Sequence, residues 1–171
     1  MPLAAAGRSP VSGAAEGRRQ RVAVYGLCTD PGDRVLLVRA SAMLTVAGRW
    51  FLPGGGLEHG EHPTVGLRRE FAEETGLSVA ETDLRGVLSD LTTLPDGTEL
   101  HTVRIIYRVG RWSGELRAET TGSSDAVRWV ERDELPTIGV MPYVAEALAQ
   151  FLGARGPEDR REGTGRVGPH S

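Results

Sequence analysis

The sequence predicts an α/β fold in which a mixed β-sheet lies between two helices. Strand-like and helix-like segments follow one another without the regular alternation that an all-parallel sheet requires. Two segments, residues 63–75 and 141–152, place apolar side chains at helical spacing. The chain has 171 residues, of which 39% are hydrophobic, and this is enough for one domain with a packed core.

The two ends of the chain differ in composition from the rest. Residues 1–19 are rich in alanine, glycine, serine and arginine, and residues 153–171 are charged and interrupted by glycine and proline. We therefore expect a disordered leader at 1–19, a folded domain at 20–152 and a disordered tail at 153–171. No apolar run is long enough to span a bilayer, and the N-terminus lacks the apolar core of a secretory signal, so we expect a cytoplasmic protein with no membrane partner.

The first part of the domain is expected to form a hairpin. Arg21–Leu27 alternates like a strand, Asp30–Asp33 is a tight turn, and Arg34–Arg39 follows as a second strand. Residues 41–49 lack a sustained period and are expected to form a loop. Trp50–Leu52 is a short extended segment that stops before a proline.

Pro63–Thr75 is expected to form a helix. Proline favours the first helical turn, and Gly76 suits the left-handed position that follows the last turn. The remaining expected elements are two long strands joined by a turn at Pro95–Gly97, one further strand and a closing helix: Leu84–Leu91, Leu100–Val109, Ala126–Val130 and Met141–Leu152.

Three carboxylates share one face of the first helix. At about 100° per residue, Glu73 and Glu74 lie about 60° and about 40° to either side of Glu70. Their mutual repulsion destabilises a helix unless something offsets it, and a hard divalent cation with oxygen ligands, such as Mg²⁺, does so. The sequence therefore predicts a metal site on this helix, with Arg69 placed to hold a glutamate through a bidentate pair.

A solvated helix with an Arg69–Glu73 ion pair is the simpler reading of an acidic stretch. The spacing argues against it, because the whole stretch from Gly55 to Leu77 repeats a pattern with several fixed positions. The probability that a random sequence matches this pattern is on the order of 10⁻⁹ per starting position. The fixed positions are Gly55, Glu61, Arg69, Glu70, Glu73, Glu74 and Gly76, with apolar Phe71 and Leu77.

This stretch resembles the Nudix box, and the segment Gly48–Gly55 before it resembles the entry to that box in Nudix hydrolases. The resemblance implies the Nudix-type α/β/α sandwich and hydrolysis of a diphosphate bond, either in a nucleoside diphosphate linked to another group or in a nucleoside triphosphate. It also implies that Mg²⁺ or Mn²⁺ lowers the pKa of a bound water, which then attacks phosphorus.

The box residues take roles from this resemblance. Glu70, Glu73 and Glu74 match its metal-binding glutamates, and Gly55 matches the glycine whose backbone oxygen joins them. Arg69 and Glu61 match the outer supports. We expect Glu70, Glu73 and Arg69 to be needed for catalysis, with either Glu70 or a loop glutamate as the base.

One position departs from the pattern of many relatives. Ala126 stands where a late glutamate often joins the metal site. Asp125 is adjacent but would point to the other face of a strand, and Glu99 or Asp96 are alternatives.

Arginines are the candidates for binding the substrate. Arg39, Arg49 and Arg104 are candidates for contact with phosphate, with a solvated surface charge as the equal alternative, and Asp125 is a further candidate for contact with the substrate. A net charge of −3 argues against a nucleic-acid polymer as partner, so we expect a small-molecule diphosphate, bound by a monomer or homodimer.

Two other functions remain as alternatives. A Nudix-fold sensor would bind a nucleotide without cutting it, but such proteins usually lose box glutamates that are all present here. A diphosphate isomerase would need an active-site cysteine, and the single cysteine, Cys28, has the sequence context of a buried core residue.

Overall fold

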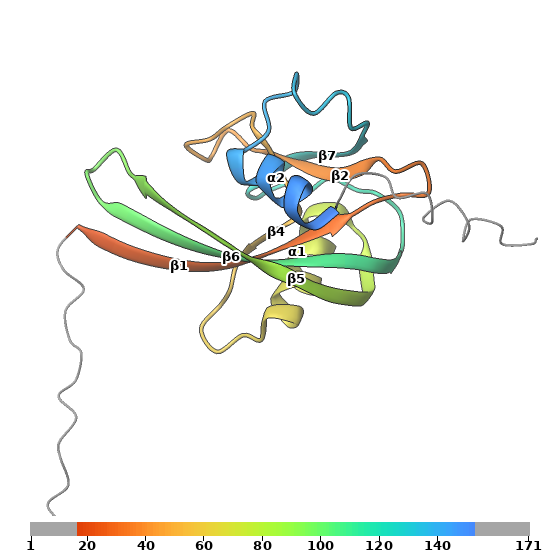
Figure 1. Ribbon diagram of the computed structural model, residues 1–171, viewed down its shortest axis with the longest axis horizontal. Helices are drawn as coiled ribbons and strands as arrows, with labels where there is room; N and C mark the ends of the chain where they lie inside the picture. Colours follow the sequence, from red (N-terminus) through yellow and green to blue (C-terminus); the bar gives the residue numbers. More distant parts are fainter. Residues whose placement is uncertain (1–16, 153–171) are drawn as a thin grey trace, which may run out of the picture.

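The computed structural model describes residues 17–152 (Figure 1). The predicted tail at 153–171 and residues 1–16 of the predicted leader therefore lie outside the described residues. The first strand begins at Arg18, inside the predicted leader. The elements are β1 (Arg18–Cys28), β2 (Val35–Ala40), β3 (Trp50–Phe51), β4 (Gly54–Gly56), α1 (Pro63–Thr75), β5 (Ser78–Thr93), β6 (Glu99–Ser113), β7 (Ser124–Val130), α2 (Pro142–Ala147) and a π-helical turn (Leu148–Leu152).

The strands form two sheets. One is mixed, with the order β4-β1-β6-β5, in which β1 runs parallel to β6 and the other neighbours are antiparallel. The other has the order β3-β2-β7 and is antiparallel. The expected hairpin is therefore wrong: after the turn at Asp30–Asp33, β2 leaves the sheet of β1, and only one isolated bridge, Thr29 to Val35, joins their ends. Residues 23–28 of β1 and 35–38 of β2 are buried on both faces, so these parts of the two strands lie between layers rather than at a surface.

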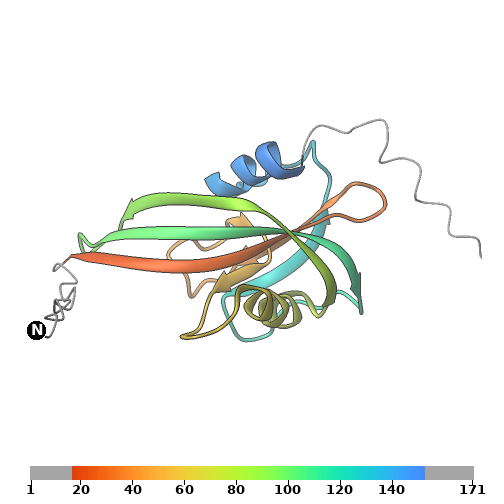
Figure 2. The same cartoon turned by 60° about the horizontal axis from the view of Figure 1, so that its bottom comes forward.

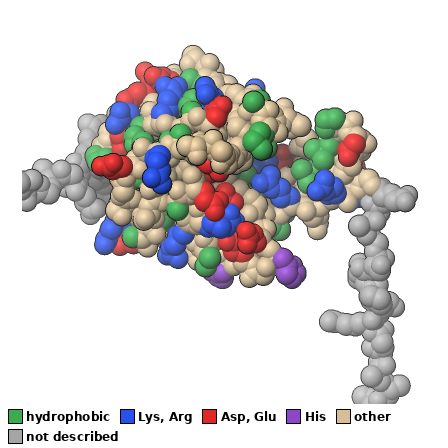
Figure 3. Space-filling view, turned by 180° about the vertical axis from the view of Figure 1, so that it is seen from behind, with side chains coloured by type: hydrophobic (Ala, Val, Ile, Leu, Met, Phe, Trp, Pro, Cys, Tyr) green, Lys and Arg blue, Asp and Glu red, His purple; other side chains and the backbone are tan. Residues whose placement is uncertain are grey.

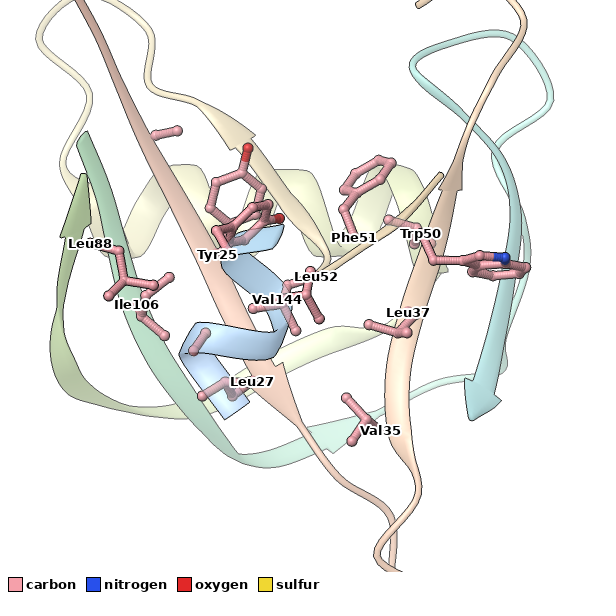
Figure 4. Close-up of a cluster of buried hydrophobic side chains, with 14 of the residues drawn as sticks. Tyr25, Leu27, Val35, Leu37, Trp50, Phe51, Leu52, Leu88, Ile106 and Val144 are labelled. Atoms are coloured by element: carbon pink, nitrogen blue, oxygen red, sulfur yellow. The ribbon is translucent and has the colours of Figure 1, made fainter. Parts of the chain in front are cut away.

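The mixed sheet lies between the two helices, which confirms the predicted sandwich (Figure 2). Alternate residues of β1 face opposite layers. Tyr25 and Leu27 belong to the core under α2, with Val144 (Figure 4), whereas Val24 belongs to the core under α1, with Phe71. No helix among residues 17–152 is long and apolar enough to cross a membrane.

Helix α1 has the bounds that the sequence predicts. His62 caps its first turn by accepting from the Thr64 amide, and Pro63 opens the helix. Gly76 takes the left-handed conformation (φ 74°) and donates its amide to the Ala72 carbonyl oxygen. The helix that carries the glutamates is thus fixed at both ends.

The other elements differ from expectation mainly in length. Strands β5 and β6 extend beyond the predicted segments at both ends, and the closing helix changes from α to π geometry after Ala147. Strand β4 was not predicted, because three consecutive glycines carry no strand signal. It nevertheless pairs with β1 from Ala23 to Tyr25, and this pairing brings the glycines to the edge of the sheet beside α1.

Candidate active site

The three box glutamates have different environments on α1. The Glu70 side chain is 12% exposed and the Glu73 side chain is 52% exposed. Glu74 is buried, with 1% of its surface exposed. The helix therefore buries Glu74 and most of Glu70 against β4 and turns Glu73 towards solvent.

Arg69 ties the entry loop to the helix. Its Nε and Nη2 atoms donate to the two Glu61 carboxylate oxygens at 2.9 Å each, which is the expected bidentate pair. Its Nη1 donates to Glu70 at 2.8 Å and to Glu73 at 3.5 Å. The hydrogen bonds from Arg69, together with one from the Glu58 amide, lower the pKa of Glu61 to about 2.

Glu74 is held from two other parts of the chain. The Gly54 amide donates to one carboxylate oxygen at 2.9 Å, and the Ser123 hydroxyl donates to the other at 3.2 Å. Burial raises the pKa of Glu74 to about 8, against the opposing effect of the Gly54 hydrogen bond. The segment before β7 therefore contributes a hydrogen bond to the acidic site through Ser123, which the sequence did not predict.

Gly55 lies directly against Glu70. A Cβ atom at position 55 would stand 2.6 Å from Glu70 Oε1, so only glycine lets this carboxylate reach the backbone. Burial raises the pKa of Glu70, while the Arg69 hydrogen bond opposes the rise. This close approach supports the pairing of Gly55 with Glu70 that the sequence suggested.

The donor set suits a hard cation in its chemistry. Glu70, Glu73, Glu74 and the Gly55 carbonyl all offer oxygen, the ligand that Mg²⁺ and Mn²⁺ prefer. In the described part of the chain, however, no three acidic, histidine or cysteine side chains converge on one point. Glu70 and Glu73 instead share Arg69, so a cation would have to replace that arginine as their common partner.

The candidates for a fourth acidic group have other partners. Asp125 forms an ion pair with Arg39 at 2.7 Å, and both side chains are more than two-fifths exposed. Glu99 pairs with Arg18, and Asp96 accepts from the Thr98 amide. Glu99 aligns with Arg18 on β1, whereas β4 aligns with Ala23–Tyr25, so Glu99 lies roughly 20 Å from the box.

Glu119 is the acidic residue that the structure brings near the box. It accepts from the Ser124 amide and hydroxyl at 3.4 Å, next to the Ser123 that binds Glu74, and its charge contributes to the raised pKa of Glu74. No spacing in the sequence connects this loop residue with the helix.

The predicted phosphate contacts also have partners of their own. Arg39 is paired with Asp125, and Arg49 donates to the Val140 carbonyl oxygen at 3.0 Å. Arg104 is buried and paired with Asp90. Acidic and arginine side chains are intermingled on the face drawn in Figure 3.

A different arginine lies beside the box. Arg21 is exposed and lies against the Gly56 backbone, where its Nε is 3.3 Å from the place of a Cβ atom. Burial raises the pKa values of Glu70 and Tyr25, and the charge of Arg21 opposes both rises. No ion pair to Arg21 is found among residues 17–152. Arg21 could not be placed at the site from the sequence, because it lies there only through the pairing of β1 with β4, a strand that was not predicted.

Cys28 is buried in the core under α1. Burial raises the pKa of its thiol to about 12, so the thiolate is scarce at neutral pH. This confirms the core role expected from the sequence. A buried thiol with a raised pKa does not suit the active-site role that an isomerase would need.

The sandwich, the glutamates of α1 and the glycine edge together define a Nudix domain, and the family model described as "NUDIX domain" matches residues 19–151. The chain belongs to this family of hydrolases. It is 33% identical over 139 residues to a "MutT-like protein" of Streptomyces ambofaciens, covering 81% of each chain. It is also 33% identical over 134 residues to "Putative 8-oxo-dGTP diphosphatase 2" of Mycobacterium tuberculosis, covering 76% of this chain and 90% of that one.

A solved structure has the same fold. The MutT NUDIX hydrolase from Burkholderia pseudomallei matches with a TM-score of 0.67 and 28% identity, over 77% of this chain and 98% of that chain. The sequence motif, the fold and the family match therefore all identify a Nudix domain.

Proposed function

We propose that this protein is a metal-dependent diphosphohydrolase that cleaves nucleoside triphosphates or related nucleoside diphosphate derivatives. The observation that carries the proposal is a pair of carboxylates, the buried Glu74 and the largely buried Glu70, held against the glycine edge at Gly54 and Gly55. Burying two acidic groups side by side is costly unless a cation neutralises them.

The cation would be Mg²⁺ or Mn²⁺, held by Glu70, Glu73, Glu74 and the Gly55 carbonyl oxygen. When bound, such a cation neutralises phosphate charge and lowers the pKa of water. The internal partners of these residues support the assignment, because Arg69 and the Gly54 amide keep the carboxylates in place when no cation is bound.

Glu70 is the proposed proton acceptor. Its raised pKa makes it a stronger base than an ordinary carboxylate, while Arg69 favours its ionised form. The oxygen of water forms a bond to phosphorus, the bond from phosphorus to the bridging oxygen breaks, and the proton of the water passes to the Glu70 carboxylate. The released group leaves as a phosphate or diphosphate anion.

Arg21 is the proposed phosphate contact in place of Arg39 and Arg49. It is exposed, lies beside Gly56 and is close enough to influence Glu70. A guanidinium at this point can donate two hydrogen bonds to one phosphate group.

We favour nucleoside triphosphates as the substrate class because of the relative described as an 8-oxo-dGTP diphosphatase. The small-molecule substrate, cytoplasmic location and monomeric or homodimeric state expected from the sequence are parts of the same proposal.

The test is hydrolysis of nucleoside triphosphates by the wild type and by Glu70→Gln. With Mg²⁺ the wild type should turn over, and excess EDTA should abolish turnover. Glu70→Gln should lower kcat by roughly 100-fold or more, because it removes both a ligand charge and the base. Glu131→Gln, at an exposed glutamate after β7, is the matched control and should retain activity.

Full turnover in excess EDTA, or near wild-type activity of Glu70→Gln, would contradict the proposal. Tight nucleotide binding without hydrolysis would instead favour the sensor alternative.

A further inference from the structure

An arginine is buried on the sheet face below α2, away from the carboxylates of α1. Arg104, on β6, is 8% exposed. Its Nη1 donates to the carboxylate of Asp90 on β5. Its guanidinium lies over the ring of Tyr143 on α2, with Cζ 4.5 Å from the ring centroid. We call Arg104, Asp90, Tyr143 and Tyr25 the Arg104 cluster.

Two polar atoms of this cluster are unsatisfied. Arg104 Nε is buried and has no hydrogen-bond partner within residues 17–152. The hydroxyl of Tyr143 is likewise buried without a partner of normal geometry in that range, although the Leu52 backbone faces it. Buried donors without partners are rare in native proteins and are destabilising, so they indicate a missing acceptor. Asp90 links the cluster to the surface, because its side chain is 47% exposed.

The Arg104 cluster adjoins the box. The Gly54 amide donates to Glu74, while the Tyr25 ring lies 2.9 Å from the place of a Cβ atom on Gly54. Tyr25 in turn contacts Tyr143, with ring centroids 4.9 Å apart. Figure 4 shows Tyr25 and the neighbouring core side chains between the sheet and α2. Across the sheet the order is β4, β1, β6, β5, so Arg104 lies two strands, or roughly 10 Å, from the glycine edge. This is about the span of a nucleoside.

The surroundings favour a planar ligand over a phosphate. The Tyr143 ring covers the guanidinium, Tyr25 packs against Tyr143, and both tyrosines belong to the apolar core, so a phosphate would lose its hydration there. A flat ring can stack in such a setting and accept hydrogen bonds at its edge. Arg104 can only donate, because a guanidinium has no acceptor.

We propose that the Arg104 cluster binds the purine base of the substrate and selects bases with an oxygen at C6. This rests on the nucleotide substrate proposed above. A 6-oxopurine presents two acceptors, O6 and N7, to a guanidinium, whereas adenine presents a donor amino group at C6. Asp90 and the Tyr143 ring hold the guanidinium plane, so Arg104 cannot turn to avoid the clash of two donors.

The test is equilibrium binding of inosine 5′-monophosphate and adenosine 5′-monophosphate to the full-length protein in EDTA. These two nucleotides differ at C6 and N1 of the base, and the measurement requires no hydrolysis. The wild type should bind the inosine nucleotide tighter by roughly 5- to 150-fold, the range for a guanidinium reading one base edge.

Arg104→Gln should reverse the preference, because glutamine matches the N6 and N7 atoms of adenine. A gain in affinity for the adenosine nucleotide cannot result from misfolding. Arg108→Gln, on the same strand beside Glu81 and Asp83, is the matched control and should keep the wild-type ratio.

Equal affinities in the wild type, an unchanged ratio in Arg104→Gln, or no inosine nucleotide binding at millimolar concentration would overturn the inference. Loss of both nucleotides in Arg104→Gln alone would also overturn it, because Arg104 would then not read the base. Failure of the proposed hydrolysis has a separate signature: selective binding in EDTA without turnover in Mg²⁺.

Discussion

The charge state of Glu74 should depend on folding. Its carboxyl is buried in the native protein, with a pKa of about 8, and is solvated in the unfolded chain, where the ordinary value is 4.5. Between these values the native state holds a proton that the unfolded state releases. The contribution of Glu74 is therefore most favourable at low pH and is lost as pH rises through this window.

The metal-free wild type should accordingly lose thermal stability relative to Glu74→Gln as pH rises from about 5 to about 8. Melting temperatures in EDTA at several pH values measure this. Glu73→Gln, at an exposed glutamate, should keep the wild-type slope. Parallel curves for wild type and Glu74→Gln would show that Glu74 does not titrate in this range.

The close contact between Gly55 and Glu70 leads to a prediction about steric fit. A methyl group at this position would stand 2.6 Å from Glu70 Oε1, so Gly55→Ala must displace the carboxylate or the strand. Displacement of a reacting group by about 1 Å lowers rates by roughly 100-fold. We expect kcat of Gly55→Ala to fall by this order, measured with saturating Mg²⁺. Gly110→Ala, where the nearest atom to a Cβ is 3.7 Å away, should retain activity.

At the scale of elements, Arg69 joins α1 to the loop before it. Arg69→Lys keeps the charge but cannot donate to both Glu61 oxygens while also reaching Glu70. We expect the free energy of unfolding to fall by about 1.5–3 kcal/mol, the value of hydrogen bonds to charged groups. Urea denaturation measures it. Arg68→Lys, which loses one bond to the Val79 carbonyl oxygen, should cost less, and equal losses would contradict the role of Arg69 as a clamp.

The elements also show what the sequence could predict. Helix α1 was predicted to the residue because Pro63, Gly76 and the carboxylate spacing are local signals. The hairpin was wrong because alternation and a turn identify two strands but not their partners, and here β2 pairs with β7 instead. The glutamates of the box were predicted, whereas Ser123, Glu119 and Arg21 were not, because they reach the site only through long-range pairing.

At the scale of the whole molecule, the cation and the fold should stabilise each other. Any ligand that binds only the native state raises stability, by about 2.7 kcal/mol at a hundred times its Kd. Mg²⁺ should therefore raise the melting temperature, and more so at pH 8 than at pH 5, where the Glu74 proton competes. Glu74→Gln should lose most of this pH dependence. An equal shift with Mg²⁺ at both pH values would contradict the involvement of Glu74.

The parallel pairing of β1 with β6 sets an order of events during synthesis. Arg18 and Glu99, which start the two strands side by side, are 81 residues apart in the chain. At about 5–20 residues per second, the ribosome delivers β6 roughly 4–16 s after β1. Until then one long edge of β1 lacks the strand that it pairs with in the finished sheet. A nascent chain that pauses between α1 and β6 therefore already contains every box glutamate but cannot complete the sheet that supports them, and the unpaired edge of β1 is then exposed to pairing with other chains.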